Sequence, residues 1–378
     1  MKASIITVCK NSEKTIARTI ESVISQKNCG YDVEYIVIDG KSEDSTLRVL
    51  KQYEQHIDVL VSEKDSGIYE AMNKGLMRST GEVIGILNSD DWYEKDAVKS
   101  SIENLIKNDA DISYGNMIVH HGDTEHIITP SWTVDSPWDH MPWPHPTVFS
   151  YKRVYESVGV FDTKYKVCAD YDWLVRCYEK QYKFSYVDSV ITNFSLGGIS
   201  DNKAKLCADE SFDIVMKHVN NMECDQKRKE ELFYIAENQR TLIYVRYYLK
   251  EEPYSIRSFL DKYNIIPGEL VLFGAGYWGS LVYDALTKCE IPIFSIVDND
   301  EEKIGKKAPF GDITVNKMDE IIESTSAVII CVRFNTEEIV KQLKAKGVQN
   351  IVQLNDLIQF YKEYKAGYTE LLKRGFKL

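Results

Sequence analysis

Apolar runs and helical patterns alternate along the first third of the chain. Four short runs rich in β-branched residues predict strands at residues 4–8, 33–39, 57–63 and 82–88. After each run, apolar side chains recur every three or four positions, which predicts helices at residues 15–26, 44–55, 66–77 and 95–108. Repeated strand–helix units favour a mainly parallel sheet with helices on both faces, so the predicted fold class is α/β.

The rest of the chain divides by pattern. After a strand expected at 110–119, the stretch up to residue 199 is rich in Pro and Trp and is predicted to be irregular, except for a helix at 170–181. A polar helical stretch follows, and a second strand–helix series starts at Leu270. We predict three parts: a first α/β domain at 1–200, a helical linker at 201–265 and a smaller α/β domain at 266–378.

Acidic and amide side chains follow several predicted strands. Asp39 and Asp65 lie at or just after strand ends, and the apolar run 83–87 stops at the polar sequence Asn88–Asp91. Ligands of parallel sheets bind at the carboxyl ends of the strands. The adjacent carboxylates Asp90 and Asp91 either cap the next helix or hold a hard cation such as Mg²⁺ or Mn²⁺. The neighbouring strand-end acids, and the lack of an Arg cluster nearby in the sequence, favour the cation.

Composition and charge remove several classes of function. The formal net charge of −12 argues against a broad nucleic-acid-binding surface. The 8 cysteines form no C-x-x-C pair, so neither a zinc site nor a dithiol redox site is indicated. The sequence starts without a signal-peptide pattern, and no apolar run approaches the ~20 residues of a membrane helix. We expect a cytoplasmic protein. Peripheral contact with the inner face of a membrane and oligomer formation are left open.

Several ordered motifs resemble family 2 glycosyltransferases, which have the GT-A fold. The first half of the resemblance is in SIITVCKNSEKTIARTIESVISQ, EYIVIDGKSEDST and SGIYEAMNKGLMRSTGEVIGILNSDDWY. The acceptor half is in HPTVFSYKRVYESVGVFDTKYKVCADYDWLVR and FSLGGIS. The resemblance covers about residues 3–200 and is specific for the family, not for the sugar. It implies an inverting, metal-dependent hexosyl- or N-acetylhexosaminyltransferase of polysaccharide biosynthesis. The expected donor is a UDP-sugar, and the acceptor is a hydroxyl of a glycan or a lipid-linked saccharide.

The resemblance also implies roles for individual residues. Nucleotide-sugar contacts fall on Thr7 and Asp39 at the base, on Asp65 in the segment that closes the base pocket, and on Asn88 and Ser89 near the ribose. Metal binding falls on Asp90 and, beside it, on Asp91. The general base is Asp170, in CADYDW. His145, in PHPTVF, matches a family histidine near the acceptor or diphosphate, with a hydrogen-bonded loop histidine as the alternative reading.

Three positions depart from the family pattern. Asn88 stands where the first Asp of a D-x-D motif is usual, so the charge for a cation is left to the two acids that follow. Lys10 replaces a Tyr that usually precedes the first-loop Asn, so the resemblance does not assign the residue that forms this wall of the base pocket. Ala169 replaces a Glu that usually precedes the base.

A glycine-rich motif opens the C-terminal α/β series. Gly274, Gly276 and Gly279 form G-x-G-x-x-G between a predicted strand and a predicted helix, and Asp298 ends the next strand. This spacing is typical of dinucleotide-binding turns. The segment resembles the small Rossmann-like domains appended to bacterial sugar-modifying enzymes. It predicts a site for NAD or another nucleotide, or else a turn that only packs helix against sheet.

Two other classes of protein stay open at this stage. One is a nucleotide-sensing or scaffold protein of a glycan pathway with a degenerate transferase domain, although the intact acids Asp39, Asp90 and Asp170 argue against degeneration. The other is an NAD-dependent sugar oxidoreductase centred on Gly274. No second catalytic half follows that motif, which weakens the oxidoreductase hypothesis.

Overall fold

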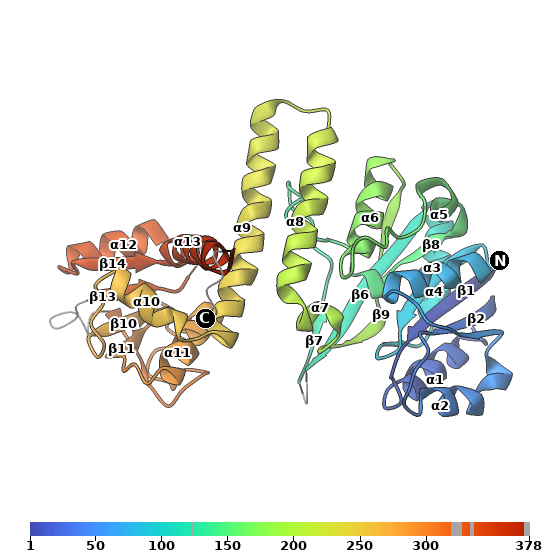
Figure 1. Cartoon of the computed structure of the whole chain (residues 1–378), viewed down its shortest axis with the longest axis horizontal. Coiled ribbons are helices and arrows are strands. Elements are labelled where there is room, and N and C mark those ends of the chain that lie inside the picture. The colour runs from blue at the N-terminus through green and yellow to red at the C-terminus, as the bar shows by residue number, and fades with distance from the viewer. Residues whose placement is uncertain (122–123, 319–326, 333–335, 374–378) are drawn as a thin grey trace. The chain divides into compact units, whose positions relative to one another are not determined.

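The computed structural model describes residues 1–121, 124–318, 327–332 and 336–373. The chain divides into two compact units, residues 1–237 and 238–378, here called the first and second units (Figure 1). Each unit has its own sheet. The division falls inside one long helix, α9 (Gln226–Glu251).

Four parallel strands form one half of the sheet in the first unit. Their order is β3-β2-β1-β4, and their bounds are β1 (Lys2–Cys9), β2 (Asp32–Asp39), β3 (Val59–Ser62) and β4 (Val83–Asn88). Val8 pairs with Asn88, and Cys9 pairs with Asp39, so the carboxyl ends of these strands meet at one edge. The strands and parallel pairing predicted for this stretch are confirmed.

The other half of the sheet is mixed, and here the sequence prediction was wrong. The order continues β8-β6-β9-β5, with β7 paired to β6; the bounds are β5 (Trp92–Tyr93), β6 (Ile112–His121), β7 (Thr124–Ile128), β8 (Phe149–Tyr151) and β9 (Phe184–Ser195). β6 runs parallel to β9 but antiparallel to β7 and β8. The stretch predicted to be irregular therefore contains paired strands. Their partners lie up to about 100 residues away, beyond the reach of local periodicity.

Helices cover both faces of this sheet. Alternate side chains of β1 enter opposite cores, with Ile5 on one face and Ile6 on the other. The core with Ile5 contains α1 (Ile16–Gln26) and α4 (Ala97–Lys107). The core with Ile6 contains α3 (Ile68–Arg78), α5 (Lys152–Val158), α6 (Ala169–Glu179) and α8 (Ala204–Asn221). Shorter elements complete the first unit: α2 (Thr46–Gln52), α7 (Ile199–Asn202) and the 3-10 turns η1 (Glu54–His56) and η2 (His145–Thr147).

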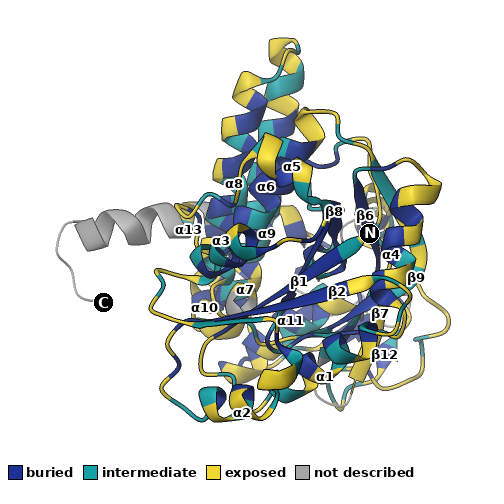
Figure 2. Cartoon of the chain, turned by 90° about the vertical axis from the view of Figure 1, so that its right-hand side faces the viewer, coloured by how far each residue is buried: buried dark blue, intermediate teal, exposed yellow. Residues whose placement is uncertain are grey.

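The segment predicted as a linker contributes to the core of the first unit. Ile214 and Val219 of α8 are fully buried, and Leu232 and Ala236 of α9 join the same cluster. Figure 2 shows this pattern on α8, with buried residues on one side and exposed residues on the other. Residues 204–236 are therefore packed against the sheet domain, while the three-part division stays a prediction.

The second unit has a five-stranded parallel sheet in the described residues. Its order is β12-β11-β10-β13-β14, with bounds β10 (Leu270–Phe273), β11 (Ser295–Val297), β12 (Val315–Asn316), β13 (Ala327–Ile330) and β14 (Asn350–Gln353). Its helices are α10 (Ser255–Lys262), α11 (Tyr277–Lys288), α12 (Thr336–Ala345) and α13 (Leu354–Lys373). The alternation predicted for this part is present.

Candidate active site

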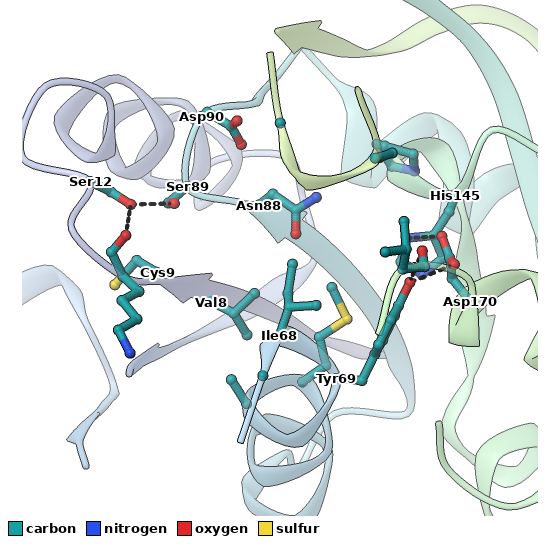
Figure 3. A pocket seen from close by; sticks show the side chains of 18 of the residues that line it. Val8, Cys9, Ser12, Ile68, Tyr69, Asn88, Ser89, Asp90, His145 and Asp170 are labelled. Carbon is teal, nitrogen blue, oxygen red and sulfur yellow. Dashed lines mark hydrogen bonds and ion pairs between the residues drawn. The ribbon is translucent and has the colours of Figure 1, made fainter. Parts of the chain in front are cut away.

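A large cavity opens at the carboxyl ends of β1 and β4 in the first unit. It has a volume of about 1110 Å³. Six of the predicted site residues line it: Asp65, Asn88, Ser89, Asp90, His145 and Asp170. Figure 3 labels all of them except Asp65. They come from four separate stretches of the chain, so the cavity exists only because the sheet brings these stretches together.

One wall of the cavity is the turn after β4. Ser89 Oγ lies 2.7 Å from Ser12 Oγ, which ties this turn to the loop after β1. Within the described residues, Asn88 Oδ1 is buried and has no hydrogen-bond partner. An unpaired buried acceptor is costly and is expected to meet a donor or a cation. The Asn88 side chain thus has an acceptor oxygen beside the cavity that no described residue uses.

Asp90 and Asp91 have different surroundings. Asp90 lines the cavity, and burial raises the pKa of its carboxyl above the ordinary value. Asp91 is fully buried and is not among the lining residues; its Oδ1 accepts a hydrogen bond from the backbone N–H of Ser195 at 3.0 Å. Its Oδ2 has no partner among the residues that the structure describes. Burial, reinforced by the charge of Asp90, raises the pKa of Asp91 well above its usual range.

A cation from a distant helix supports this acidic turn. Arg18 of α1 donates to the backbone carbonyl of Asp90 at 2.7 Å and to Ser195 Oγ at 3.1 Å. Its guanidinium lies 3.5 Å from the centroid of the Trp92 ring. Its charge lowers the pKa of both acids, but burial outweighs this effect. Local sequence patterns could not predict this partner, because Arg18 is about 70 residues away along the chain.

The opposite wall carries Asp170 and its neighbours. Asp170 lies in the first turn of α6, where its Oδ1 is 2.8 Å from the hydroxyl of Tyr69. The same hydroxyl lies 2.6 Å from the carbonyl oxygen of Val167, so it can donate to only one of the two at a time. His145 Nδ1 lies 3.8 Å from Asp170 Oδ2. Burial lowers the pKa of His145, although the charge of Asp170 opposes the shift, and burial thus favours the neutral imidazole.

Three predicted base-contact residues lie in different places. Thr7 is fully buried, accepts a hydrogen bond from Tyr35 at 3.2 Å and is not among the lining residues. Asp39 is also fully buried, and its carboxylate accepts hydrogen bonds from Ser42 and from Ser62 Oγ. Only Asp65 reaches the cavity itself. The nucleotide roles of all three stay predictions.

Sequence reasoning missed several functional candidates. Tyr69 and Ser12 line the cavity and hydrogen-bond to predicted site residues, yet each reads as an ordinary helix or loop position. Lys14 was also missed; it lines the cavity and is exposed, as is Lys10, which the family comparison had already singled out at the base pocket. Position after a strand end is the one signal that points to Lys10, Ser12 and Lys14 in advance, because the loop after β1 must border the same edge as Asn88.

The glycine-rich turn of the second unit is built as a tight strand–helix connection. Gly274 has φ +110°, in the region that favours glycine, and a Cβ at Gly279 would overlap the carbonyl oxygen of Gly274. Gly276 differs, because a Cβ there meets no atom within 4 Å. Two of the glycines are thus required by the fold, and the third leaves open space over the start of α11.

Asp298 is used inside this turn. Its Oδ2 accepts from the backbone N–H of Ala275 at 2.8 Å, and its Oδ1 accepts from the backbone N–H of Asp300 at 2.9 Å. Lys303 Nζ lies 3.3 Å from the same carboxylate. The acid that was predicted to meet a ribose therefore also holds the glycine turn in place.

Two features are absent from the described part of the chain. It has no cluster of three or more His, Cys, Asp or Glu side chains arranged to hold a metal. None of its described helices is long and apolar enough to span a membrane.

Comparison with known proteins gives a family match for part of the first unit. Residues 4–165 match the model of glycosyl transferase family 2. A PGL/p-HBAD biosynthesis glycosyltransferase of Mycobacterium tuberculosis is 25% identical over 205 residues, which cover 52% of this chain and 78% of the relative. The glycosyltransferase GlyA of Streptococcus pneumoniae is 23% identical over 210 residues, covering 53% of this chain and 27% of that protein.

Solved structures share the fold. The crystal structure of S. aureus TarS residues 1–349 with UDP-GlcNAc has a TM-score of 0.54 at 17% identity, covering 70% of this chain and 81% of that one. A second TarS 1–349 structure has a TM-score of 0.52. Residues 4–165 thus match a glycosyltransferase domain of family 2, and the likeness to TarS shows a shared GT-A-like fold.

Proposed function

We propose that the first unit is an inverting, metal-dependent glycosyltransferase. It moves a sugar from a nucleotide-sugar donor, expected to be a UDP-sugar, to a hydroxyl of a glycan or a lipid-linked saccharide. The observation that carries this proposal is the shared cavity, which has Asp90 on one wall and Asp170 on the other. Relatives named for PGL/p-HBAD biosynthesis and for teichuronic acid biosynthesis, and TarS bound to UDP-GlcNAc, support the choice of donor and acceptor classes.

The residues at the end of β4 fit a hard cation with oxygen ligands. Asn88 Oδ1 lacks a partner within the described structure, and the Asp90 carboxyl with its raised pKa gains from a positive neighbour. Asp91 faces Ser195 behind this wall, so we assign it to shaping the turn and assign ion binding to Asp90 with Asn88. One or two protein ligands suffice for Mg²⁺ or Mn²⁺ when donor phosphates complete the shell. Such an ion offsets the charge that develops on the leaving diphosphate.

Asp170 acts on the acceptor. The acceptor hydroxyl gives its proton to the Asp170 carboxylate while its oxygen attacks the anomeric carbon, and the bond from that carbon to the diphosphate oxygen breaks. A single displacement of this kind inverts the anomeric centre. Tyr69 holds one Asp170 oxygen, so the other faces neutral His145 and the cavity. His145 is then placed to hydrogen-bond the acceptor or the diphosphate.

The test is a panel of nucleotide sugars assayed for release of nucleoside diphosphate, with Mn²⁺ and with EDTA. We expect turnover with at least one UDP-sugar that stops in EDTA and returns with Mn²⁺ or Mg²⁺. Full activity in chelator would remove the metal from the proposal. Thermal stabilisation by a donor without any turnover would instead favour a sensing role, and neither stabilisation nor turnover would favour a scaffold role.

We also propose a second, smaller function for the C-terminal unit: a Rossmann-like domain that binds a nucleotide such as NAD at Gly274–Gly279. Numbered from β10 along the chain, its strands lie in the order 3-2-1-4-5, the arrangement of dinucleotide-binding sheets. The open space over Gly276, at the start of α11, supports close approach of a phosphate. Thermal shift of the full chain with NAD, with Gly276→Val as the non-binding variant, tests it. Absence of any shift favours a turn used only for packing.

A further inference from the structure

A buried carboxylate outside the family match holds the loop that leads to Asp170. Glu210 lies on α8 and is 8% exposed. Its Oε1 accepts a hydrogen bond from the backbone N–H of Lys166 at 2.7 Å. Its Oε2 accepts from the N–H groups of Val167 at 2.8 Å and Cys168 at 3.0 Å. One carboxylate thus binds three consecutive amides, and the last of them belongs to the residue that precedes α6.

The peptide at Val167 is held from two sides. Its N–H donates to Glu210, and its carbonyl oxygen lies 2.6 Å from the Tyr69 hydroxyl. That hydroxyl is also the hydrogen-bond partner of Asp170. A shift of this peptide would therefore move the hydroxyl that orients the proposed base. Glu210 is not itself a lining residue, but Lys166 and Val167, whose N–H groups it binds, line the cavity, so its effect on chemistry passes through this loop.

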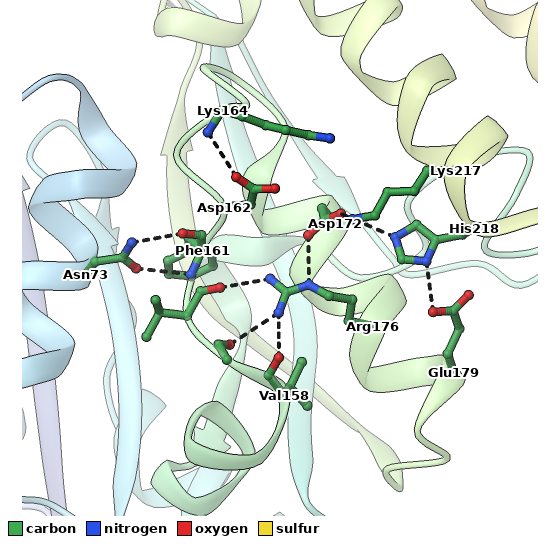
Figure 4. A network of polar contacts seen from close by, with 12 residues as sticks. Asn73, Val158, Phe161, Asp162, Lys164, Asp172, Arg176, Glu179, Lys217 and His218 are labelled. Carbon is green, nitrogen blue, oxygen red and sulfur yellow. Dashed lines mark hydrogen bonds and ion pairs between the residues drawn. The ribbon is translucent and has the colours of Figure 1, made fainter. Parts of the chain in front are cut away.

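The same face of α8 contacts α6 again two turns later. Lys217 Nζ lies 2.8 Å from Asp172 Oδ1, and His218 bridges Asp172 at 3.3 Å and Glu179 at 2.8 Å (Figure 4). Positions 210, 217 and 218 are seven and eight residues apart, which places them on one stripe of the helix. The contacts at Lys217 and His218 fix the body of α6. Glu210 instead binds the backbone of the entry loop.

We propose that Glu210 is a positioning residue for Asp170, through the backbone of residues 166–168. This inference rests on the proposed role of Asp170 as the general base. It assigns a part of the acceptor site to α8, a helix that lies beyond the matched residues 4–165. A role in packing alone would couple α8 to α6 without changing the rate of transfer in the folded protein.

The experiment compares Glu210→Ala and Glu210→Gln with Asp213→Ala in the full chain. Asp213 is an exposed residue on the same helix and serves as the control for a lost acid on α8. With the best donor found in the panel, we expect Glu210→Ala to lower kcat by about ten- to a hundred-fold, as for a misplaced catalytic group. The KM for the nucleotide sugar should stay close to wild type, because the turn at Asp90 is untouched. Glu210→Gln should recover part of kcat, since its carbonyl oxygen still accepts hydrogen bonds.

Two readouts separate positioning from loss of fold. Circular dichroism and thermal unfolding establish that the variants are folded, and hydrogen exchange of residues 166–168 should be faster in Glu210→Ala than in Asp213→Ala. A folded Glu210→Ala with wild-type kcat overturns the inference. A parallel fall in kcat and rise in donor KM also overturns it, because the donor site would then be damaged.

Failure of the proposed function gives a different result. Asp170→Asn is assayed in the same series, and wild-type turnover in that variant would reject Asp170 as the base whatever Glu210 does. Wild-type protein without transferase activity would reject the function itself and this inference with it. An inactive Asp170→Asn beside a fully active, folded Glu210→Ala rejects the inference alone.

Discussion

The acid near the amino end of β2 and the two acids that follow β4 have opposite surroundings in the first unit. At the amino end, Glu34 of β2 accepts from the Ser4 hydroxyl, from the N–H and hydroxyl of Thr80, and from Lys2 at 3.0 Å. Burial acts to raise its pKa, but these donors outweigh burial and lower the pKa to about 2. At the carboxyl end, burial raises the pKa of Asp90 and Asp91, and in the described residues one Asp91 oxygen has no partner.

The difference shows how a fold stabilises one acid and keeps another reactive. A carboxylate with several donors stabilises the protein and has little left to offer a ligand. A carboxylate with a raised pKa costs stability while ionised, and a bound cation recovers that cost. The sequence presents both kinds as an acid near a strand, so their partners, not their positions, identify the site.

The largest expected effect is at the acids that follow β4, whose pKa values are raised by burial. Asp90→Asn should lower metal-dependent turnover by at least about a hundred-fold, because it removes the charged ligand of an ion whose contribution is several kcal/mol. Titration with Mn²⁺ at fixed donor concentration measures it. Asp91→Asn is the matched control and should keep the Mn²⁺ dependence. If Asp91→Asn loses the metal and Asp90→Asn does not, the assignment of the two acids is reversed.

The next effect separates the two walls of the cavity. Asp170→Asn should lower kcat by about 10²–10⁴ while leaving donor binding intact, since a base acts on the acceptor hydroxyl. Calorimetry with UDP and Mn²⁺ on this variant provides the check. A collapse of UDP affinity together with the rate would show that Asp170 binds the donor and that the base lies elsewhere.

The hydrogen-bonded carboxylate of Glu34 should control the stability of the protein and its pH dependence. With a pKa lowered from 4.5 to about 2, Glu34 contributes roughly 3 kcal/mol above pH 4.5, and this contribution is lost as the pH falls towards 2. Glu34→Gln should therefore unfold at lower urea than wild type at pH 7, and the gap should shrink in acid. The nearby exposed Glu82→Gln serves as the control and should match wild type. A gap that does not change with pH would contradict the ionic explanation.

The smallest effect concerns the glycine-rich turn after β10 in the second unit. There the Asp298 carboxylate accepts hydrogen bonds from nearby backbone N–H groups. Gly279→Ala should destabilise the chain by about 1–3 kcal/mol through overpacking against the Gly274 carbonyl. Gly276→Ala should stay within about 0.5 kcal/mol, because its Cβ meets open space. Thermal unfolding of both variants decides it. Equal losses would show that Gly276 also packs, and the space proposed for a nucleotide would not exist.

Local sequence patterns determined much of the framework. The apolar runs and helical spacing predicted β1 to β4, α1, α3, α4 and the α/β series of the second unit, because a strand or helix repeats over a few residues. The resemblance pointed to six side chains that line the cavity, among them Asp90 and Asp170. The strands β8 and β9 were not predicted, because their formation depends on pairing with distant strands across the sheet.

Only the tertiary structure decided how similar residues differ. Asp90 and Asp91 are neighbours in the sequence, yet one faces the cavity and the other a strand nearly 100 residues away. Glu34 and Asp91 are both buried, yet their pKa values shift in opposite directions. Glu210 reads as one more acid on a polar helix until α8 is placed beside the entry to α6. Burial, hydrogen-bond donors and nearby charges come from segments distant in the chain, and local periodicity carries no record of them.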